Sequence, residues 1–240
     1  LFEVIQASWE GKKAVGCTEI NGFELYQRVV CVRQRSGFNS PMGTPASYTG
    51  IFDRIRELMA SQPEAREAGF GKNAFSYLDK SGRCPACEGA GQIRVSMDFL
   101  PDVKMECEVC HGTRYRPEIL KVTFRGRNIA GILELTIAEA CEFFEDQKHL
   151  VQQLQLLVRV GLGYLPTGQP LDTLSGGESQ RLVLAAELMN AVKGKTLYLF
   201  DEPSTGLNFR DVEHLLVLFH QLADQGNTLI FTEHDPLMIG

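Results

Sequence analysis

Residues 171–182 read L-D-T-L-S-G-G-E-S-Q-R-L, and residues 196–202 read T-L-Y-L-F-D-E. In the first stretch, Ser175 and Glu178 have capping-box spacing, and apolar residues at helical spacing follow from Leu182. Two glycines at a helix N-terminus leave several backbone N–H groups exposed, and the helix dipole adds positive potential there. The stretch therefore predicts a capped helix, either an ordinary one or one whose start holds a phosphate.

The second stretch predicts a strand that is buried on both faces, because four apolar residues follow one another. Two carboxylates come next, at the strand's carboxyl end, where ligands of open α/β sheets bind. Asp201 is placed to hold Mg²⁺, directly or through water, and Glu202 to orient and deprotonate an attacking water. A surface turn, Asp-Glu-Pro, is the plainer interpretation of these residues.

The residues that follow predict a second strand with polar residues at its carboxyl end. S-T-G-L at 204–207 precedes a helical pattern that runs from Phe209 to Leu222. Thr228 to Phe231 then predicts another buried strand, and it ends in Thr-Glu-His. A lone histidine is more often structural than catalytic, but His234 occupies a strand's carboxyl end, where a sensor of the γ-phosphate would be needed.

Taken in order, these motifs resemble the ATP-binding-cassette family: a signature L-S-G-G, a Walker B strand with its glutamate, a D-loop and a switch histidine. The resemblance implies that the signature binds the γ-phosphate of a nucleotide held by a different cassette, so that ATP lies between two cassettes. It implies Glu202 and His234 as catalytic residues. It also implies ATP and Mg²⁺ as cofactors, with nucleotide or Mg²⁺ contacts at Gln34, Ser175, Gly176, Gly177, Glu178, Gln180 and Asp201.

Four cysteines stand in two pairs, Cys84/Cys87 and Cys107/Cys110, as C-x2-C, a gap of 19 residues and C-x2-C. This is the spacing of a four-thiolate zinc site, and glycines after each pair allow the positive φ that such knuckles need. A closed four-thiolate site serves folding rather than catalysis. Two disulfides are the alternative, which the absence of a signal-peptide pattern disfavours. The other three cysteines read as buried thiols: Cys17, Cys31 and Cys141.

Joined to the signature, the zinc pattern resembles the A-subunit family of the bacterial excinuclease ABC over almost the whole chain, in its C-terminal cassette. The resemblance rests on residues 39–50, 82–116, 161–164, 168–170 and 174–181. It implies an α/β fold: an ABC-type ATPase nucleotide-binding domain, an incomplete P-loop NTPase fold, with an inserted zinc-binding signature domain. The implied domains are a partial ATP-binding lobe with its Q-loop (1–50), the insertion (51–128, with a zinc module at 81–116), and the signature and Walker B half (129–240).

The family resemblance also implies a function. Its members recognise damaged double-stranded DNA at the start of nucleotide excision repair, hydrolyse ATP as a dimer, and hand the lesion to the excinuclease B subunit. A divergent paralogue that protects DNA from drug adducts is an alternative. A transporter's ATPase and a non-enzymatic zinc and DNA module are further ones.

Two features depart from the family. No G-x-x-x-x-G-K-[ST] phosphate loop occurs in the 240 residues, and we expect it to precede Leu1, so that this chain alone is inactive. Gln34 is the best candidate for the Q-loop glutamine, but Arg35 to Phe38 interrupt the usual pattern. The region that binds the B subunit belongs to the first cassette, outside this sequence.

The net charge of −6 does not exclude DNA, because it averages two unlike parts. Residues 1–127 carry 18 basic and 15 acidic side chains, whereas residues 128–240 carry 6 and 15. Five cations cluster with Tyr115 and Phe124, as in a phosphate-contacting surface, although an ordinary solvated face would read the same way. These cations are Arg114, Arg116, Lys121, Arg125 and Arg127.

Local patterns predict several further elements. A strand is expected near Val29 to Val32, helices over 51–60, 136–147 and 149–160, and a strand and turn over 117–127. No apolar run approaches the length of about 20 residues that a membrane helix needs, and the expected location is the cytoplasm.

Overall fold

The computed structural model describes residues 2–12, 16–17, 20–22, 25–32, 42–97, 100–190 and 195–239. The chain divides into two compact units. The first unit comprises residues 1–37, 156–163 and 174–240, and the second comprises residues 38–155 and 164–173. These units are defined by compactness, and the division by function at residues 50 and 128 stays a prediction.

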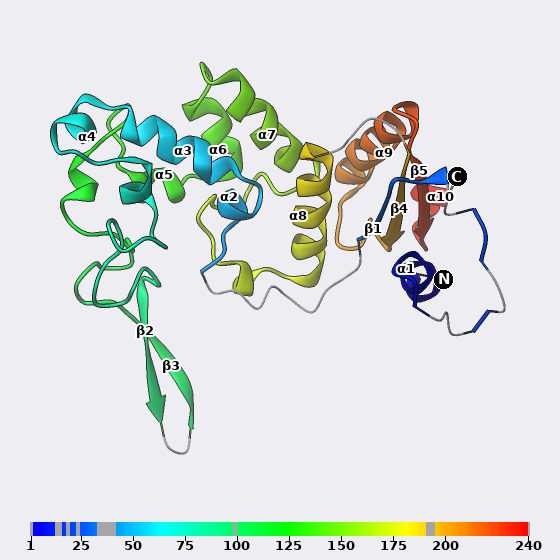
Figure 1. The fold of residues 1–240 in the computed structure, drawn as a ribbon, viewed down its shortest axis with the longest axis horizontal. Coiled ribbons are helices and arrows are strands. Elements are labelled where there is room, and N and C mark those ends of the chain that lie inside the picture. Colours follow the sequence, from blue (N-terminus) through cyan, green and yellow to red (C-terminus); the bar gives the residue numbers. More distant parts are fainter. Residues whose placement is uncertain are drawn as a thin grey trace. The chain divides into compact units, whose positions relative to one another are not determined.

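The first unit is an α/β structure built on parallel strands in the order β1-β4-β5 (Figure 1). The predicted strand near Val29 is confirmed as β1, and the helix and strand that follow the signature are confirmed as α8 and β4. Its elements are α1 (Phe2–Trp9), β1 (Arg28–Val32), α8 (Gly176–Met189), β4 (Thr196–Asp201), α9 (Phe209–Asp224), β5 (Thr228–Thr232) and α10 (Pro236–Ile239).

The central strand β4 is buried on both faces, as its apolar run predicts. Successive side chains of a strand point to opposite faces. Leu197 and Leu199 therefore pack with Ile5 of α1 on one face. On the other face, the ring of Phe200 lies 4.7 Å from that of Phe219 in α9.

The parallel register brings two polar segments to one edge of the sheet. Asp201 pairs with Thr232, so residues 201–202 and 232–234 leave the sheet at the same end. The expectation that β5 is buried is wrong, since its first three residues are half-buried and its last two are exposed. The reason is its place: β5 pairs with β4 on one side, and no other strand within the described residues pairs with it.

The second unit is mainly helical and carries an antiparallel hairpin, β2–β3. Helix α7 (Lys148–Arg159) begins in this unit and ends in the first. The other elements are α2 (Pro45–Tyr48), α3 (Ile51–Ala60), α4 (Pro63–Glu67), the 3-10 helix η2 (Lys72–Phe75), β2 (Gln92–Met97), β3 (Leu100–Glu106), η3 (Ile119–Lys121), α5 (Ile129–Leu133), α6 (Ile137–Phe143) and η4 (Leu171–Thr173).

Three local expectations need correction. Residues 117–127, all of them described, contain the 3-10 helix η3 and a single bridge between Phe124 and Arg127, but no strand; the turn at Gly126 is confirmed. Helix α6 ends at Phe143 rather than 147. The lone cysteines are not buried thiols, since Cys17 is exposed and both Cys31 and Cys141 are half-buried.

The segment that leads into the cysteine pairs is packed tightly around Gly82. A Cβ atom at Gly82 would lie 1.8 Å from the carbonyl oxygen of Ala74, so no side chain fits there. We expect Gly82→Ala to lower the free energy of unfolding of the second unit by about 3 kcal/mol, because the backbone has to move. Urea titration of the protein checks this.

Gly71→Ala is the matched control, since nothing lies within 4 Å of a Cβ atom built at Gly71 and its φ is −81°. We expect its effect to stay within about 0.5 kcal/mol. Equal effects of the two substitutions would show that close packing at Gly82 is unimportant.

Candidate functional site

The start of α8 presents the geometry that the signature pattern predicts. Ser175 is the N-cap, and its hydroxyl oxygen accepts the Glu178 N–H at 3.2 Å. The Glu178 carboxylate in turn accepts the Ser175 N–H at 2.7 Å, which completes the capping box. Ser175 is exposed and Gly176 and Gly177 are half-exposed, so the positive end of the helix is open to an anion.

Gln180, predicted to contact a nucleotide, points the other way. Its side chain is buried, and Nε2 donates to the backbone oxygen of Asp201. The next residue, Arg181, is buried as well and donates from Nη1 to the backbone oxygen of Thr205 at 3.3 Å. The N-terminus of α8 is therefore exposed to solvent. Side chains of its second turn instead hydrogen-bond to the end of β4 and to the loop that follows it.

The carboxylates after β4 lie beside the residues that follow β5. The Thr232 hydroxyl donates to Oδ1 of Asp201 at 2.7 Å. Nε2 of His234 lies 3.6 Å from Oε1 of Glu202, and Thr205 Oγ1 lies 3.4 Å from Oε2 of the same carboxylate. The structure thus brings Asp201, Glu202 and His234 together, although they come from two strands. Gln34 lies outside the described residues.

Glu233, between the paired strand and His234, organises the loop at this edge. One of its carboxylate oxygens accepts the Ser204 N–H at 2.8 Å, and the other accepts the N–H groups of His234 and Asp235. Burial raises the pKa of Glu233, but these hydrogen bonds outweigh it and hold the pKa below its ordinary value. Sequence reasoning missed Glu233, Thr205 and Thr232, because nothing in their spacing shows that two loops meet.

The four paired cysteines form one buried cluster in the second unit. Their sulfur atoms all lie within 4.8 Å of one another, with Cys84 Sγ 4.0 Å from Cys107 Sγ and Cys87 Sγ 3.6 Å from Cys110 Sγ. A tetrahedral zinc with Zn–S bonds of about 2.3 Å separates its ligand atoms by roughly 3.8 Å. The four thiols therefore fit a zinc ion.

Glycines at positive φ shape both knuckles, as the sequence predicts: Gly89, Gly91 and Gly112 have φ values of 89°, 74° and 76°. The backbone also acts on the thiols. Hydrogen bonds from the N–H groups of Cys110 and Val109 lower the pKa of Cys107 to about 7. Burial raises the pKa of Cys87 and of Cys110, which is the direction that a bound cation would reverse.

Between the two cysteine pairs lies the hairpin, which the sequence analysis did not predict. Ile93 pairs with Met105 across the two strands, and both apolar side chains are exposed. The alternation I-R-V-S-M at 93–97 is the signal that could have revealed it.

Three of the five predicted DNA-contacting cations contact other residues of the second unit. Arg114 lies over the ring of Tyr77 at 5.0 Å, and Arg116 donates to the backbone oxygens of Arg83 and Lys80. Arg125 pairs with Asp146 at 2.9 Å. Arg114 is half-buried, and the other four are exposed: Arg116, Lys121, Arg125 and Arg127.

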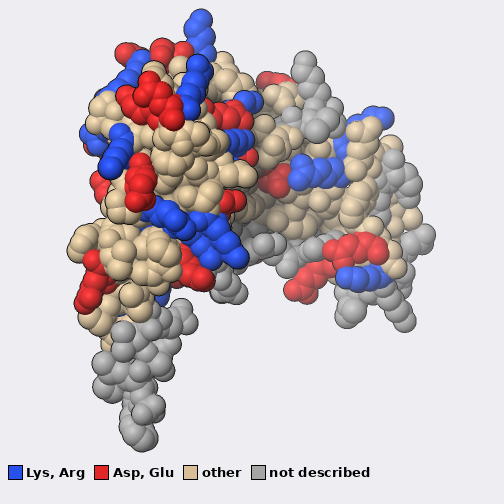
Figure 2. All heavy atoms as spheres, turned by 60° about the vertical axis from the view of Figure 1, so that its left-hand side comes forward, with Lys and Arg blue, Asp and Glu red and all other residues tan. Residues whose placement is uncertain are grey.

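The aromatic neighbours of these cations are not open stacking platforms. Tyr115 is buried and its hydroxyl donates to the Phe75 carbonyl, while Phe124 stacks on Phe144. Tyr115 therefore offers no open face for stacking and Phe124 is half-buried, while the phosphate-contacting surface stays a prediction. On the face drawn in Figure 2, basic side chains alternate with acidic ones over the second unit.

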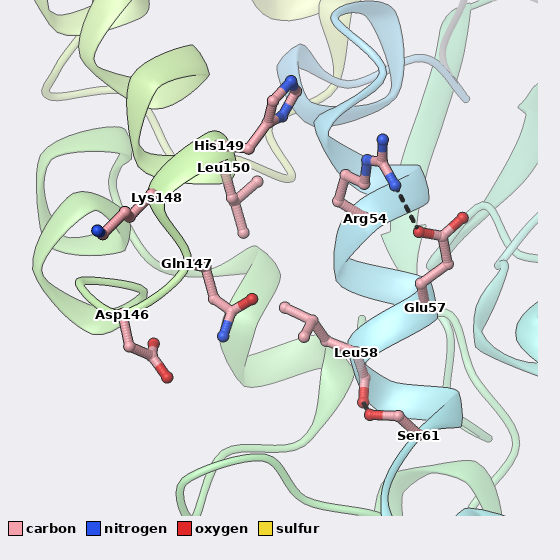
Figure 3. Close-up of a pocket in the computed structure, with 9 residues that line it drawn as sticks. All are labelled: Arg54, Glu57, Leu58, Ser61, Asp146, Gln147, Lys148, His149 and Leu150. Carbon is pink, nitrogen blue, oxygen red and sulfur yellow. Dashed lines mark hydrogen bonds and ion pairs between the residues drawn. The ribbon is translucent and has the colours of Figure 1, made fainter.

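A hollow of about 660 Å³ lies elsewhere in the second unit, between α3 and the start of α7 (Figure 3). Its two carboxylates are already engaged: Glu57 pairs with Arg54 and Lys72, and Asp146 with Arg125. None of the predicted catalytic or metal-binding residues lines it. It is therefore separate from the candidate site.

The described residues include no helix with the length and apolar character that crossing a membrane requires. No family model matches the chain. Comparison with curated proteins and solved structures, by contrast, finds extensive similarity.

The chain is 48% identical to UvrABC system protein A of Thermus thermophilus over 216 residues, which is 90% of this chain and 23% of that protein. It is 46% identical to UvrABC system protein A of Micrococcus luteus over 237 residues, 98% of this chain and 24% of that protein. The crystal structure of UvrA2 from Deinococcus radiodurans matches with a TM-score of 0.89 and 43% identity, over 98% of this chain and 29% of that one.

The chain thus spans about a quarter of the length of the curated relatives it matches. Within that quarter, the likeness extends over nine-tenths or more of its own residues and includes both the cysteine cluster and the signature helix. The chain is therefore similar, over almost all of its own residues, to about a quarter of UvrABC system protein A.

Proposed function

We propose that the chain is part of a DNA-damage recognition ATPase of nucleotide excision repair. The observation that carries this proposal is the combination, in one chain with this similarity, of a four-thiol cluster with a signature helix and an Asp-Glu pair at a strand's end. The alternative of a drug-resistance paralogue is not favoured, because the relatives at 46–49% identity bear the name of the UvrABC protein.

In the proposed reaction, Asp201 would hold Mg²⁺ and Glu202 would accept a proton from the attacking water. The Thr232 hydroxyl orients the Asp201 carboxylate, and Glu202 is half-exposed beside His234, so solvent reaches its carboxylate. Mg²⁺, when bound, neutralises charge on the phosphate oxygens. His234, as an exposed donor at the same edge, would contact the γ-phosphate.

Ser175, Gly176 and Gly177 would receive the γ-phosphate of a nucleotide held by another cassette. The exposed N-terminus of α8 supports this role, since Ser175 is exposed and Gly176 and Gly177 are half-exposed. Glu178 contributes by completing the cap rather than by touching the nucleotide, because its carboxylate is engaged with the Ser175 N–H. A homodimer, or a tandem pair of cassettes, is the assembly that such a shared site requires.

For zinc we propose a structural role in the insertion at 51–128. Four buried thiols leave no position for a substrate, so the ion would hold the two knuckles together. The 240 residues contain no G-x-x-x-x-G-K-[ST] sequence, and we propose that this chain by itself does not turn over ATP.

The proposed partners are damaged double-stranded DNA and the excinuclease B subunit, the latter through regions outside this sequence. Arg116, Lys121, Arg125 and Arg127 are exposed, and their charge suits phosphate contacts. Because the substrate is chromosomal DNA, the expected location is the cytoplasm.

The test compares affinity for a duplex with one bulky lesion and for the same duplex intact. It uses the longer protein that carries this segment together with its phosphate loop. We expect tighter binding to the lesion under conditions that support ATP turnover, since a lesion lowers the cost of deforming the duplex. Equal affinities in the presence of turnover would count against damage recognition.

A further inference from the structure

The signature helix is tied to the loop after the Walker B strand by two consecutive side chains. Gln180 donates to the backbone oxygen of Asp201, and Arg181 donates to that of Thr205 at 3.3 Å. Only 3% of Gln180 and 6% of Arg181 is exposed. The two acceptors flank Glu202 in the sequence. Helix α8 therefore hydrogen-bonds to the segment that carries this carboxylate on both sides of it.

The contact leaves little room for a side chain at Gly177. A Cβ atom at Gly177 would lie 3.1 Å from the Thr205 oxygen and 3.4 Å from Nη1 of Arg181. The first turn of α8, the Arg181 guanidinium and the Thr205 carbonyl therefore lie against one another. A shift of the helix start moves this carbonyl as well.

From Thr205 the connection continues to Glu202. The Thr205 N–H donates to the Glu202 carbonyl at 3.2 Å, and the Thr205 hydroxyl lies 3.4 Å from Glu202 Oε2. Glu202 itself has a φ of 46°, which is uncommon for a residue with a side chain and needs support from its surroundings. Thr205 supplies part of that support.

Burying Arg181 costs more folding free energy than burying an apolar side chain of the same size. Its Nε is buried with no hydrogen-bond partner among the described residues, and a buried cation without full compensation destabilises a fold. A methionine of similar length would fill the space at a lower cost. The charge therefore points to a role other than stability.

We propose that Arg181 is a positioning residue for ATP hydrolysis, which couples the start of α8 to Glu202 through Thr205. This inference rests on the proposed ATPase function. The start of α8 meets a nucleotide held by another cassette, while Glu202 acts on the nucleotide of its own. Arg181 then links two ATP sites, so that filling one aligns the catalytic carboxylate of the other.

The first test measures kcat and KM for ATP in the longer protein that contains this chain and a phosphate loop. Arg181→Met removes the charge and the donor at similar length, and we expect kcat to fall about tenfold with KM within about twofold. Arg181→Lys keeps a charged donor, and we expect it to recover kcat to within about threefold of the parent. Arg210→Met, on the exposed start of α9, is the matched control and should match the parent.

The second test asks whether Arg181 acts through Thr205. Thr205→Val removes the hydroxyl beside Glu202, and we expect it to lower kcat several-fold. Because both changes break one connection, the double variant should be no slower than Arg181→Met alone. Losses of kcat that multiply would overturn the proposed route. If Arg181→Met does not fold, Thr205→Val and Arg181→Lys decide, and parental kcat in Thr205→Val overturns the proposal.

The two proposals fail in different ways. A parent protein without ATP turnover would refute the proposed ATPase. Suppose instead that the parent turns over ATP. Unchanged kcat in Arg181→Met would then refute only the positioning role of Arg181. Joint loss of kcat, nucleotide affinity and thermal stability in that variant would do the same.

Discussion

Glu202→Gln is expected to abolish most ATP hydrolysis while nucleotide binding persists. Glutamine keeps the size of the side chain and can still bind a water molecule, but its amide cannot accept the proton of that water. General bases contribute about 10²- to 10⁴-fold to a rate, so we expect kcat to fall by at least roughly a hundredfold, or about 3 kcal/mol of barrier. Single-turnover hydrolysis and equilibrium nucleotide binding, both in the longer protein, measure the two effects separately.

The geometry explains why binding should survive. Half of the Glu202 side chain is in solvent, and its polar neighbours, Thr205 and His234, can hydrogen-bond to an amide as well as to a carboxylate. Asp201, which would hold Mg²⁺, is oriented by Thr232 and not by Glu202. The substitution thus removes the base without disturbing the proposed cation site.

Glu213→Gln is the matched control, because Glu213 is an exposed acid on α9, outside the edge where the loops meet. It should hydrolyse ATP like the parent. Normal turnover in Glu202→Gln would remove Glu202 from the base role. Loss of nucleotide binding in that variant would instead assign Glu202 to cation or phosphate binding.

The sequence predicts this edge well because local rules govern it. A capping box fixes where α8 begins, and a run of apolar residues fixes where β4 ends, so Ser175 and Glu202 could be located without a structure. The role of Gln180 could not be predicted in this way. Whether a side chain on a short apolar helix faces solvent or the sheet depends on tertiary packing, and Gln180 proves to be buried.

The second unit shows the same contrast, between its four paired cysteines and its five predicted DNA-contacting cations. Cysteine spacing predicts the cluster, because four thiols at these intervals have one economical arrangement around an ion. Charge clustering was a poorer guide to the surface. Arg114 and Arg125, close in the sequence to Lys121 and Arg127, turn to a Tyr77 ring and to Asp146. Composition does not distinguish an arginine that supports the fold from one that meets a phosphate.

Cys84→Ser is the second change with a large expected effect, the loss of zinc together with the local fold around it. A serine hydroxyl is not a thiolate, so three ligands remain for the ion. Because structural zinc contributes about 10–16 kcal/mol of apparent binding energy in small domains, the loss of one ligand should release the metal at ordinary chelator concentrations. Metal analysis of the purified protein, after dialysis against chelator, measures this.

Unfolding should spread from the cluster along defined contacts. The Cys84 N–H donates to the Arg114 carbonyl at 2.8 Å, which places the first knuckle beside Tyr115. Tyr115 is buried, and its hydroxyl donates to the Phe75 carbonyl at the end of η2. Hydrogen exchange should therefore rise across residues 82–116, while α8, β4 and α9 in the first unit keep their protection.

Cys141→Ser is the matched control, since Cys141 is a half-buried thiol on α6 and lies outside the cluster. It should retain zinc and the protection of residues 82–116. Stoichiometric zinc in Cys84→Ser would contradict the four-thiolate site. Loss of zinc without any rise in exchange would show that the hairpin and the Tyr115 anchor hold the module by themselves, and zinc would then have no structural role in this fold.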